Sequence, residues 1–296
     1  MSKPVFLLMP EWQGSSSSRA MQLAEGAATL REDLPATATR EVQVPLEAGD
    51  AMGTPIARLS SLLRARASAH QVLGEVEANG VPVIVGGDCA SSLPGLEAAV
   101  RLHGADRVAV LWFDAHPDLQ HPSTSPSGAA SGMTLRHALG DGAPDLASAA
   151  PIDPALLTLV GTRSIDPDED DELERLGVQV MDPVAIASAT DLAANPDPAA
   201  LASSISDRLA GSGATRVYVH VDLDVLDPAE FAAVHEPVPF GLTIAQLTSA
   251  IRAAVTSLPL AGAAICEFAP ADSSVAADDL PTVLRILAAL TSGPAA

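Results

Sequence analysis

Eight short apolar runs recur along this chain, and most of them are separated by segments long enough to form a helix. The runs are dominated by Val, Leu and Ile, which is typical of strands buried on both faces of a parallel sheet. They lie near residues 5–10, 40–45, 81–88, 107–114, 156–163, 178–182, 216–224 and 262–268. Segments with helical spacing occupy residues 55–79, 168–177, 199–210, 243–257 and 279–290.

Strands that alternate with helices predict an α/β fold with right-handed crossovers, a parallel sheet and helices on both of its faces. We see no internal repeat and no long linker, so a single domain over residues 1–296 is expected. In such sheets the ligand site lies beyond the carboxyl ends of the strands.

Two of the apolar runs end in carboxylates. Asp114, His116 and Asp118 follow the fourth run, and Asp222 and Asp224 follow the seventh. In an extended chain, side chains two residues apart point the same way. A lone Asp-x-Asp is usually a solvated turn or helix cap. Two such clusters, one with a histidine, instead favour a divalent cation, and oxygen ligands with one imidazole suit Mn²⁺.

The charge of the chain narrows the classes of partner. Its formal net charge is −21, which argues against nucleic acid and against anionic membranes. The same charge favours small cationic or neutral substrates. Hydrophobic residues make up 48% of the chain but aromatic residues only 3%, so the core must be aliphatic.

Targeting signals and disulfides are not expected. No apolar run reaches the length of a membrane span, and the apolar part of residues 1–10 is too short for a secretory signal. The two cysteines, Cys89 and Cys266, do not make a disulfide framework. A cytoplasmic enzyme is the resulting expectation.

Five motifs in a fixed order resemble the arginase/agmatinase family of ureohydrolases. They are Gly-Gly-Asp-Cys at 86–89, Asp-Ala-His-Pro-Asp at 114–118, residues 161–169, His-Val-Asp-Leu-Asp-Val-Leu-Asp-Pro at 220–228, and Glu267. The resemblance implies a three-layer αβα sandwich around a central eight-stranded, mostly parallel sheet. It also implies a two-manganese centre that activates a bridging hydroxide to attack a guanidinium carbon, and a homo-oligomer, either a trimer or a hexamer.

The resemblance assigns metal ligands position by position. It implies that Asp114 and Asp222 bridge both metals and that His116 and Asp224 complete one of them. Asp118 then ligates the other metal and accepts a hydrogen bond from the hydroxide.

The resemblance also assigns substrate-binding residues. Glu267 is expected to pair with the guanidinium group, and Asp166 and Glu169 lie in the loop that reaches the far end of the substrate in the family. The chemistry requires such groups, since two cations lower the pKa of a shared water and an acid must protonate the departing amine.

Cys89 stands where the family usually has a histidine ligand of the first metal. A thiolate is a softer ligand and prefers Zn²⁺, Fe²⁺ or Co²⁺ to Mn²⁺. The alternative is a buried, inert thiol that leaves the first site weak or empty. The sequence leaves both readings open, and with them whether one or two metals bind.

Ser131 stands where arginases have a histidine thought to shuttle protons, and Ala129 replaces an asparagine that helps to hold the amino acid end. Recognition of arginine is therefore not expected. His121 and His235 are candidate replacements for the shuttle, although the sequence favours a solvated loop histidine for each of them. His220 points either toward the site or into the core.

The sequence thus predicts a metal-dependent hydrolase of linear amidine or guanidine C–N bonds whose substrate is not arginine. The alternative is a catalytically impaired or non-catalytic protein of the same fold that binds a metal or small ligand. A nucleotide-binding protein is excluded, because Gly86-Gly87-Asp88 matches neither a dinucleotide fingerprint nor a P-loop.

Overall fold

A computed structural model describes residues 3–76, 80–182 and 197–293. Its eight strands form one sheet in the order β2-β1-β3-β8-β7-β4-β5-β6, and every neighbouring pair is parallel. The strands are β1 Lys3–Met9, β2 Thr39–Glu41, β3 Gly80–Gly86, β4 Val108–Phe113, β5 Leu157–Val160, β6 Gln179–Met181, β7 Arg216–Asp222 and β8 Leu260–Cys266. The predicted parallel sheet is confirmed.

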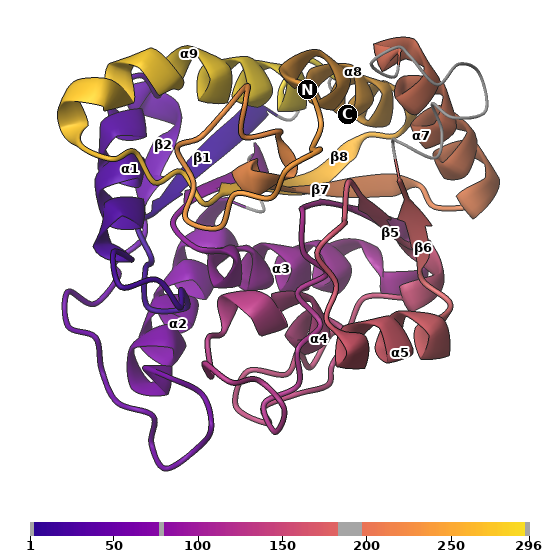
Figure 1. Ribbon diagram of the computed structural model, residues 1–296. Helices are drawn as coiled ribbons and strands as arrows, with labels where there is room; N and C mark the ends of the chain where they lie inside the picture. The colour runs from indigo at the N-terminus through magenta and orange to yellow at the C-terminus, as the bar shows by residue number, and fades with distance from the viewer. Residues whose placement is uncertain (1–2, 77–79, 183–196, 294–296) are drawn as a thin grey trace.

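Helices cover both faces of the sheet, as expected for a three-layer sandwich (Figure 1). One layer contains α1 Met21–Arg31, α7 Pro198–Ser212, α8 Ile244–Ser257 and α9 Ser273–Leu290. The other contains α2 Leu59–Val76, α3 Leu93–His103, α4 Thr134–Ala138 and α5 Pro167–Leu176. None of the helices that the structure describes is both long and apolar enough to cross a membrane.

The central strands form because their side chains are buried on both faces. All six residues of β4 are buried, and so are the last six of β7. Val217 and Val219 pack against the α7–α9 layer, whereas Tyr218 between them packs against α3. Complete burial of one such aliphatic side chain contributes about 1.5–3 kcal/mol. Successive side chains of β7 are thus buried on opposite faces of the sheet, and this alternation determines toward which face each site residue after the strand points.

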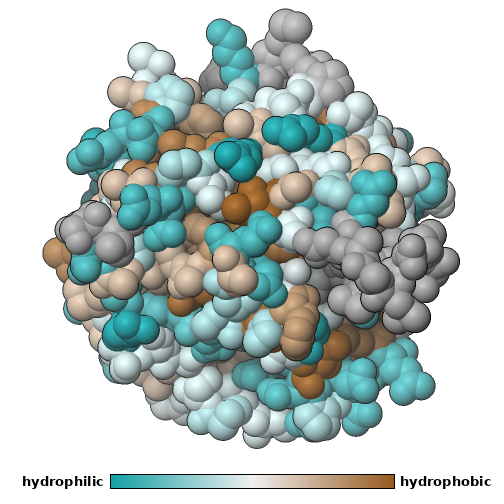
Figure 2. Space-filling view, turned by 45° about the horizontal axis from the view of Figure 1, so that its top comes forward, coloured by the Kyte–Doolittle hydropathy of each residue, from teal (hydrophilic) through white to brown (hydrophobic). Residues whose placement is uncertain are grey.

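The face of the molecule drawn in Figure 2 carries hydrophilic and near-neutral residues over most of its coloured area, with its strongly hydrophobic residues in small separate patches. A core built from aliphatic side chains is thus kept inside, in agreement with the composition.

Several element boundaries differ from the sequence prediction. β2 ends at Glu41, not near residue 45, because Val42 and Val44 pack on the core from a loop. α9 begins at Ser273, six residues before the predicted start, and carries Pro281 inside it. α2 begins at Leu59 rather than at residue 55, and its predicted end at residue 79 lies outside the described residues.

Candidate functional site

A cavity of about 290 Å³ opens beyond the carboxyl ends of the central strands. Most of the residues singled out in the sequence line it: Cys89, His116, Asp118, Ser131, Asp166, Glu169, Asp222, Asp224, His235 and Glu267. Asp114 is fully buried, and its carboxylate lies within 4.8 Å of the ligand atoms of the lining residues His116 and Asp224. Neither lysine nor arginine is among the described residues that line the cavity.

Asp114, His116 and Asp224 form the first cluster at the floor of this cavity, with one ligand atom from each within 4.8 Å of the others. His116 Nδ1 lies 2.9 Å from Asp224 Oδ2, and the His116 backbone N–H donates to Asp114 Oδ1 at 2.7 Å. Burial, together with the charge of Asp224, raises the pKa of Asp114 to about 7. Against the opposing effect of burial, the two carboxylates raise the pKa of His116 to about 12.

Cys89, Asp222 and Glu267 form a second cluster, whose ligand atoms also lie within 4.8 Å of one another. Cys89 lies in η2 (Cys89–Ser92), just after β3, and its thiol donates to Asp222 Oδ2 at 3.0 Å. Burial raises the pKa of the Cys89 thiol, with Cys266 and Asp222 adding to the effect. Burial likewise raises the pKa of Glu267. Without a cation, charge on these groups is therefore strongly disfavoured.

Two residues of the site adopt a left-handed backbone that non-glycine residues rarely take. Asp118 has φ of 52° and Glu267 has φ of 64°. Such conformations cost on the order of 1–3 kcal/mol and cluster at functional sites. Both carboxylates line the cavity, Glu267 directly after β8 and Asp118 in the loop that follows β4.

The donor set fits a divalent cation. Asp118 Oδ2 is buried and has no hydrogen-bond partner among the described residues. Buried carboxylates are stable only when paired, hydrogen-bonded or bound to a metal. The ligand atoms of the two clusters are mostly oxygen, with one imidazole and one sulfur, which is a set that binds first-row transition metals.

His235 and His121 have different surroundings. His235 Nδ1 lies 4.0 Å from Glu267 Oε2, and its side chain is only 4% exposed. Its other ring nitrogen lies 3.2 Å from Gln22 Oε1, on α1. His121 is absent from the cavity lining, and its Nδ1 instead contacts Ser123 Oγ at 2.7 Å. The structure therefore brings His235 to the site and does not bring His121.

Asp166 and Glu169 line the cavity, but their side chains are engaged in the fold. They form a capping box at the start of α5. Glu169 also accepts the Leu119 backbone N–H at 2.9 Å, and Gln120 donates to Asp166 Oδ2 at 3.1 Å. Both carboxylates thus position the loop that follows Asp118, in addition to facing the cavity.

Comparison with known proteins identifies the family. The model of the arginase family matches residues 12–281. The chain belongs to the arginase family.

Individual relatives agree with this assignment. N(omega)-hydroxy-L-arginine amidinohydrolase of Streptomyces lavendulae is 30% identical over 283 residues, covering 93% of this chain and 94% of that protein. The arginase of Entamoeba histolytica, solved with L-ornithine, has a TM-score of 0.83 at 21% identity and covers 98% of this chain and 99% of its own. The arginase of Bacillus caldovelox has a TM-score of 0.80 at 21% identity, with 99% of each chain covered. These likenesses confirm the three-layer fold.

Within this arginase-family fold, Arg163 is a positioning residue that the sequence analysis did not single out. Its guanidinium donates to the backbone oxygens of Asp224 at 2.9 Å, Gly161 at 2.8 Å and Val238 at 2.7 Å. It thereby ties the segment after β5 to the loop after β7. The only sequence signal was its place in the motif at 161–169.

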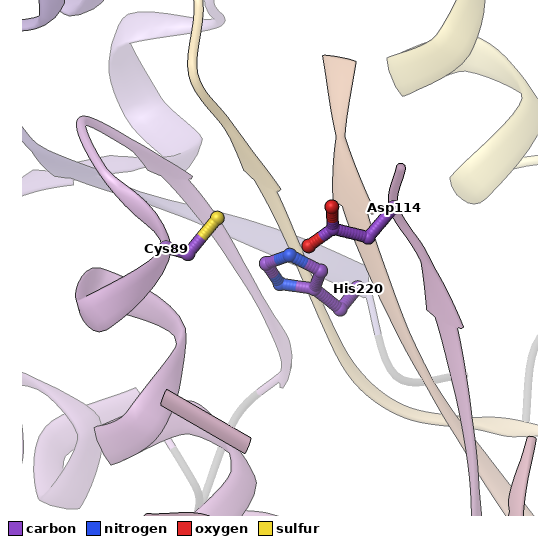
Figure 3. Close-up of side chains that lie close together, drawn as sticks. All are labelled: Cys89, Asp114 and His220. Carbon is purple, nitrogen blue, oxygen red and sulfur yellow. The ribbon is translucent and has the colours of Figure 1, made fainter. Parts of the chain in front are cut away.

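His220 is the second residue whose surroundings the sequence left open. It is fully buried, and neither ring nitrogen has a hydrogen-bond partner among the described residues. Its ring stacks on Trp112 at 3.5 Å with an interplanar angle of 7°. The structure resolves its direction, since it points toward Cys89 and Asp114 (Figure 3).

Proposed function

We propose that this arginase-family chain is a metal-dependent hydrolase of the C–N bond of a small guanidino compound. The observation that carries the proposal is the position of Glu267, which lies within 4.8 Å of Cys89 and Asp222 and lines the same cavity as His116 and Asp224. No lysine or arginine among the described lining residues competes for its carboxylate. A planar guanidinium cation is a matching partner, because it presents paired N–H donors to a carboxylate.

Six residues would hold the metal: Cys89, Asp114, His116, Asp118, Asp222 and Asp224. When bound, the metal supplies a Lewis acid that lowers the pKa of water and so provides a nucleophile at neutral pH. We expect Mn²⁺ where oxygen ligands dominate, and Zn²⁺, Fe²⁺ or Co²⁺ where Cys89 contributes sulfur.

The protein side chains orient the substrate and move protons. Glu267 binds the guanidinium group and sets its carbon against the ligand clusters. Water oxygen becomes bonded to that carbon, the bond from carbon to the alkyl nitrogen breaks, and the departing nitrogen takes up a proton to leave as an amine. His235 Nδ1, 4.0 Å from Glu267, is the group we assign to carry this proton, because Ser131 does not titrate near neutral pH.

The lining of the cavity selects the substrate class. Among the described residues, seven carboxylates line it, from Asp118, Asp166, Glu169, Asp222, Asp224, Glu236 and Glu267. This negatively charged surface attracts a cationic head group. It repels a carboxylate on the substrate unless hydroxyl or amide groups of the protein donate hydrogen bonds to that carboxylate. Ser16, Ser127, Ser164 and Gln120 provide such donors. Nω-Hydroxy-L-arginine, the compound in the name of the relative from Streptomyces lavendulae, is the first substrate to test.

A substrate panel tests the proposal. Metal-loaded protein is incubated with Nω-hydroxy-L-arginine, L-arginine and agmatine, and the release of hydroxyurea or urea is measured before and after chelation. We expect turnover of at least one compound and slower turnover of arginine and agmatine. Glu267→Gln should lower kcat/KM at least about 100-fold with metal content unchanged, because it removes the ionic partner of the cation. Asp207→Asn, an exposed change on α7, is the matched control.

Failure of every substrate with two metals bound per chain would overturn the proposal and favour a non-catalytic metal-binding role. The family resemblance also predicts a homo-oligomer, which light scattering on the same preparation measures.

A further inference from the structure

His220, Cys89 and Asp114 place three different donor atoms around one point (Figure 3), and Cys89 also lines the cavity. The sulfur, a ring nitrogen and a carboxylate oxygen all lie within 4.8 Å of one another, and all three residues are buried. In Figure 3 the three side chains come from three separate segments and converge on the space between them.

The sheet register explains this convergence. His220 pairs with Trp112 across β7 and β4, so the two rings stand on the same face of the sheet. Asp114 is two residues beyond Trp112 and continues on that face. On the other side of β7, His220 pairs with Ala264 of β8, whose small side chain leaves room for the imidazole.

An imidazole in this position needs a partner. Both of its ring nitrogens lack hydrogen bonds among the described residues, and the residue has 0% exposure. Leaving a buried polar group unsatisfied costs about 1–3 kcal/mol. Stacking on Trp112 uses the face of the ring and leaves the nitrogens in its plane available.

We propose that His220 ligates a divalent metal together with Cys89 and Asp114, so that the first metal site of this chain has sulfur, nitrogen and oxygen donors. The inference rests on the proposed metal-dependent function and names the ligands of one of its sites. Two ligands at about 2.1 and 2.3 Å from one ion are at most about 4.4 Å apart. The three donor atoms all lie within 4.8 Å of one another, so each separation exceeds this span by a few tenths of an ångström at most.

The donor types determine which metal enters. A thiolate and an imidazole favour Zn²⁺, Fe²⁺ or Co²⁺, whereas the neighbouring cluster of Asp114, His116 and Asp224 is richer in oxygen and suits Mn²⁺. With Asp114 shared between them, the chain holds two unlike sites. Cys89 also donates to Asp222 Oδ2 and belongs to the cluster with Asp222 and Glu267. In the competing arrangement the ion binds within that cluster, and His220 takes no part.

Metal titration distinguishes these arrangements. Chelator-treated protein is titrated with Co²⁺, and the sulfur-to-cobalt charge-transfer absorption and the bound metal per chain are recorded. We expect the band in wild-type protein, its loss in Cys89→Ala, and its retention in Cys266→Ala. His220→Asn should lower the affinity of the sulfur-containing site at least about tenfold. His137→Asn, which changes another buried histidine outside the cavity lining, is the matched control.

Equal Co²⁺ affinity and an unchanged band in His220→Asn would overturn the assignment. A measurement that does not alter His220 covers the case in which that variant fails to fold. X-ray absorption of His116→Asn protein with one Zn²⁺ bound should show sulfur and imidazole donors together, and a spectrum without imidazole contradicts the proposal. These readouts involve no substrate, so they separate a failure of this ligand assignment from a failure of the proposed hydrolysis.

Discussion

The indole N–H of Trp112 donates a 3.0 Å hydrogen bond to Asp114 Oδ2 from within the same strand end. Asp114 Oδ1 accepts the backbone N–H of His116, so each oxygen of this buried carboxylate has a fixed donor. The same indole stacks on His220. Trp112 thereby holds in place a ligand of one cluster and the imidazole proposed for the other.

Trp112→Phe tests this relationship. Phenylalanine keeps an aromatic ring against His220 but lacks the N–H donor. Groups that orient a metal ligand typically change metal affinity about 10–100-fold, and we expect a loss of that size with the fold retained. Metal titration measures the affinity, and circular dichroism shows whether the fold is retained. Trp12→Phe, which alters the ring beneath Arg58, should leave metal affinity unchanged; equal affinities in the two variants contradict the prediction.

Gly87→Ala tests the close approach of two strand ends. A Cβ on Gly87 would overlap the backbone carbonyl oxygen of Glu11, a group that cannot swing aside. We expect a loss of about 3 kcal/mol in unfolding free energy. Gly74→Ala is the control, because nothing lies within 4 Å of its Cβ on α2 and alanine should stabilise the helix by about 0.5–1 kcal/mol. Denaturant unfolding that shows the same sign for both variants would refute the account.

Arg163→Lys separates charge from geometry. Lysine keeps the charge but cannot donate to several carbonyl oxygens at once. We expect a loss of roughly 2 kcal/mol in stability, together with weaker metal binding because the Asp224 backbone is released. Arg208→Lys is the matched control. Arg208 donates to Ala155 O at 2.7 Å and to Thr158 Oγ1 at 3.0 Å near the start of β5, away from the site, so its variant should lose stability and keep metal affinity.

His137 gives the stability of the fold a specific acid dependence. Burial, together with Arg66 and Arg136, lowers its pKa to about 4. In the unfolded chain His137 takes up a proton near pH 6.5, whereas in the folded chain it does so only near pH 4. Its contribution is therefore present above pH 6.5 and lost as the pH falls to 4, by roughly 3 kcal/mol at most.

Comparison of wild type with His137→Asn isolates this effect, since other titrating groups remain in both. The unfolding free energy of metal-free protein is measured by urea titration from pH 7 to pH 4. We expect the decline to be shallower in the variant, and parallel curves would count against the assignment.

The sequence predicted the central strands well because burial on both faces leaves an uninterrupted apolar run. The prediction failed where residues are buried without belonging to a strand, or where a helix lacks a clear helical pattern. Val42 and Val44 are apolar because they cover the core, yet they lie beyond β2. The helix α1 was not predicted; it contains Gly26, which is required because a side chain there would overlap the backbone of Phe268. In α3, Pro94 and Gly95 lower the apparent helical propensity of a segment that tertiary contacts stabilise.

The candidate site followed the same division. Carboxylates at strand ends were predictable, because parallel strands bring their carboxyl ends to one edge of the sheet. The orientation of loop histidines was not, since it depends on contacts such as His121 with Ser123 and His235 with Gln22. His220 lay between these cases: alternation placed it on the face of Asp222, but its neighbours Trp112 and Ala264 come from the register of other strands.

The most direct test of the proposed hydrolysis is the fate of oxygen in ¹⁸O-labelled water. Metal-loaded protein is supplied with Nω-hydroxy-L-arginine, and its products are analysed by mass spectrometry. The account predicts one ¹⁸O atom in the released hydroxyurea and none in the amine product. Label retained in a ureido amino acid, with the hydroxylamine or ammonia fragment released instead, would show that a different C–N bond breaks and would contradict the account.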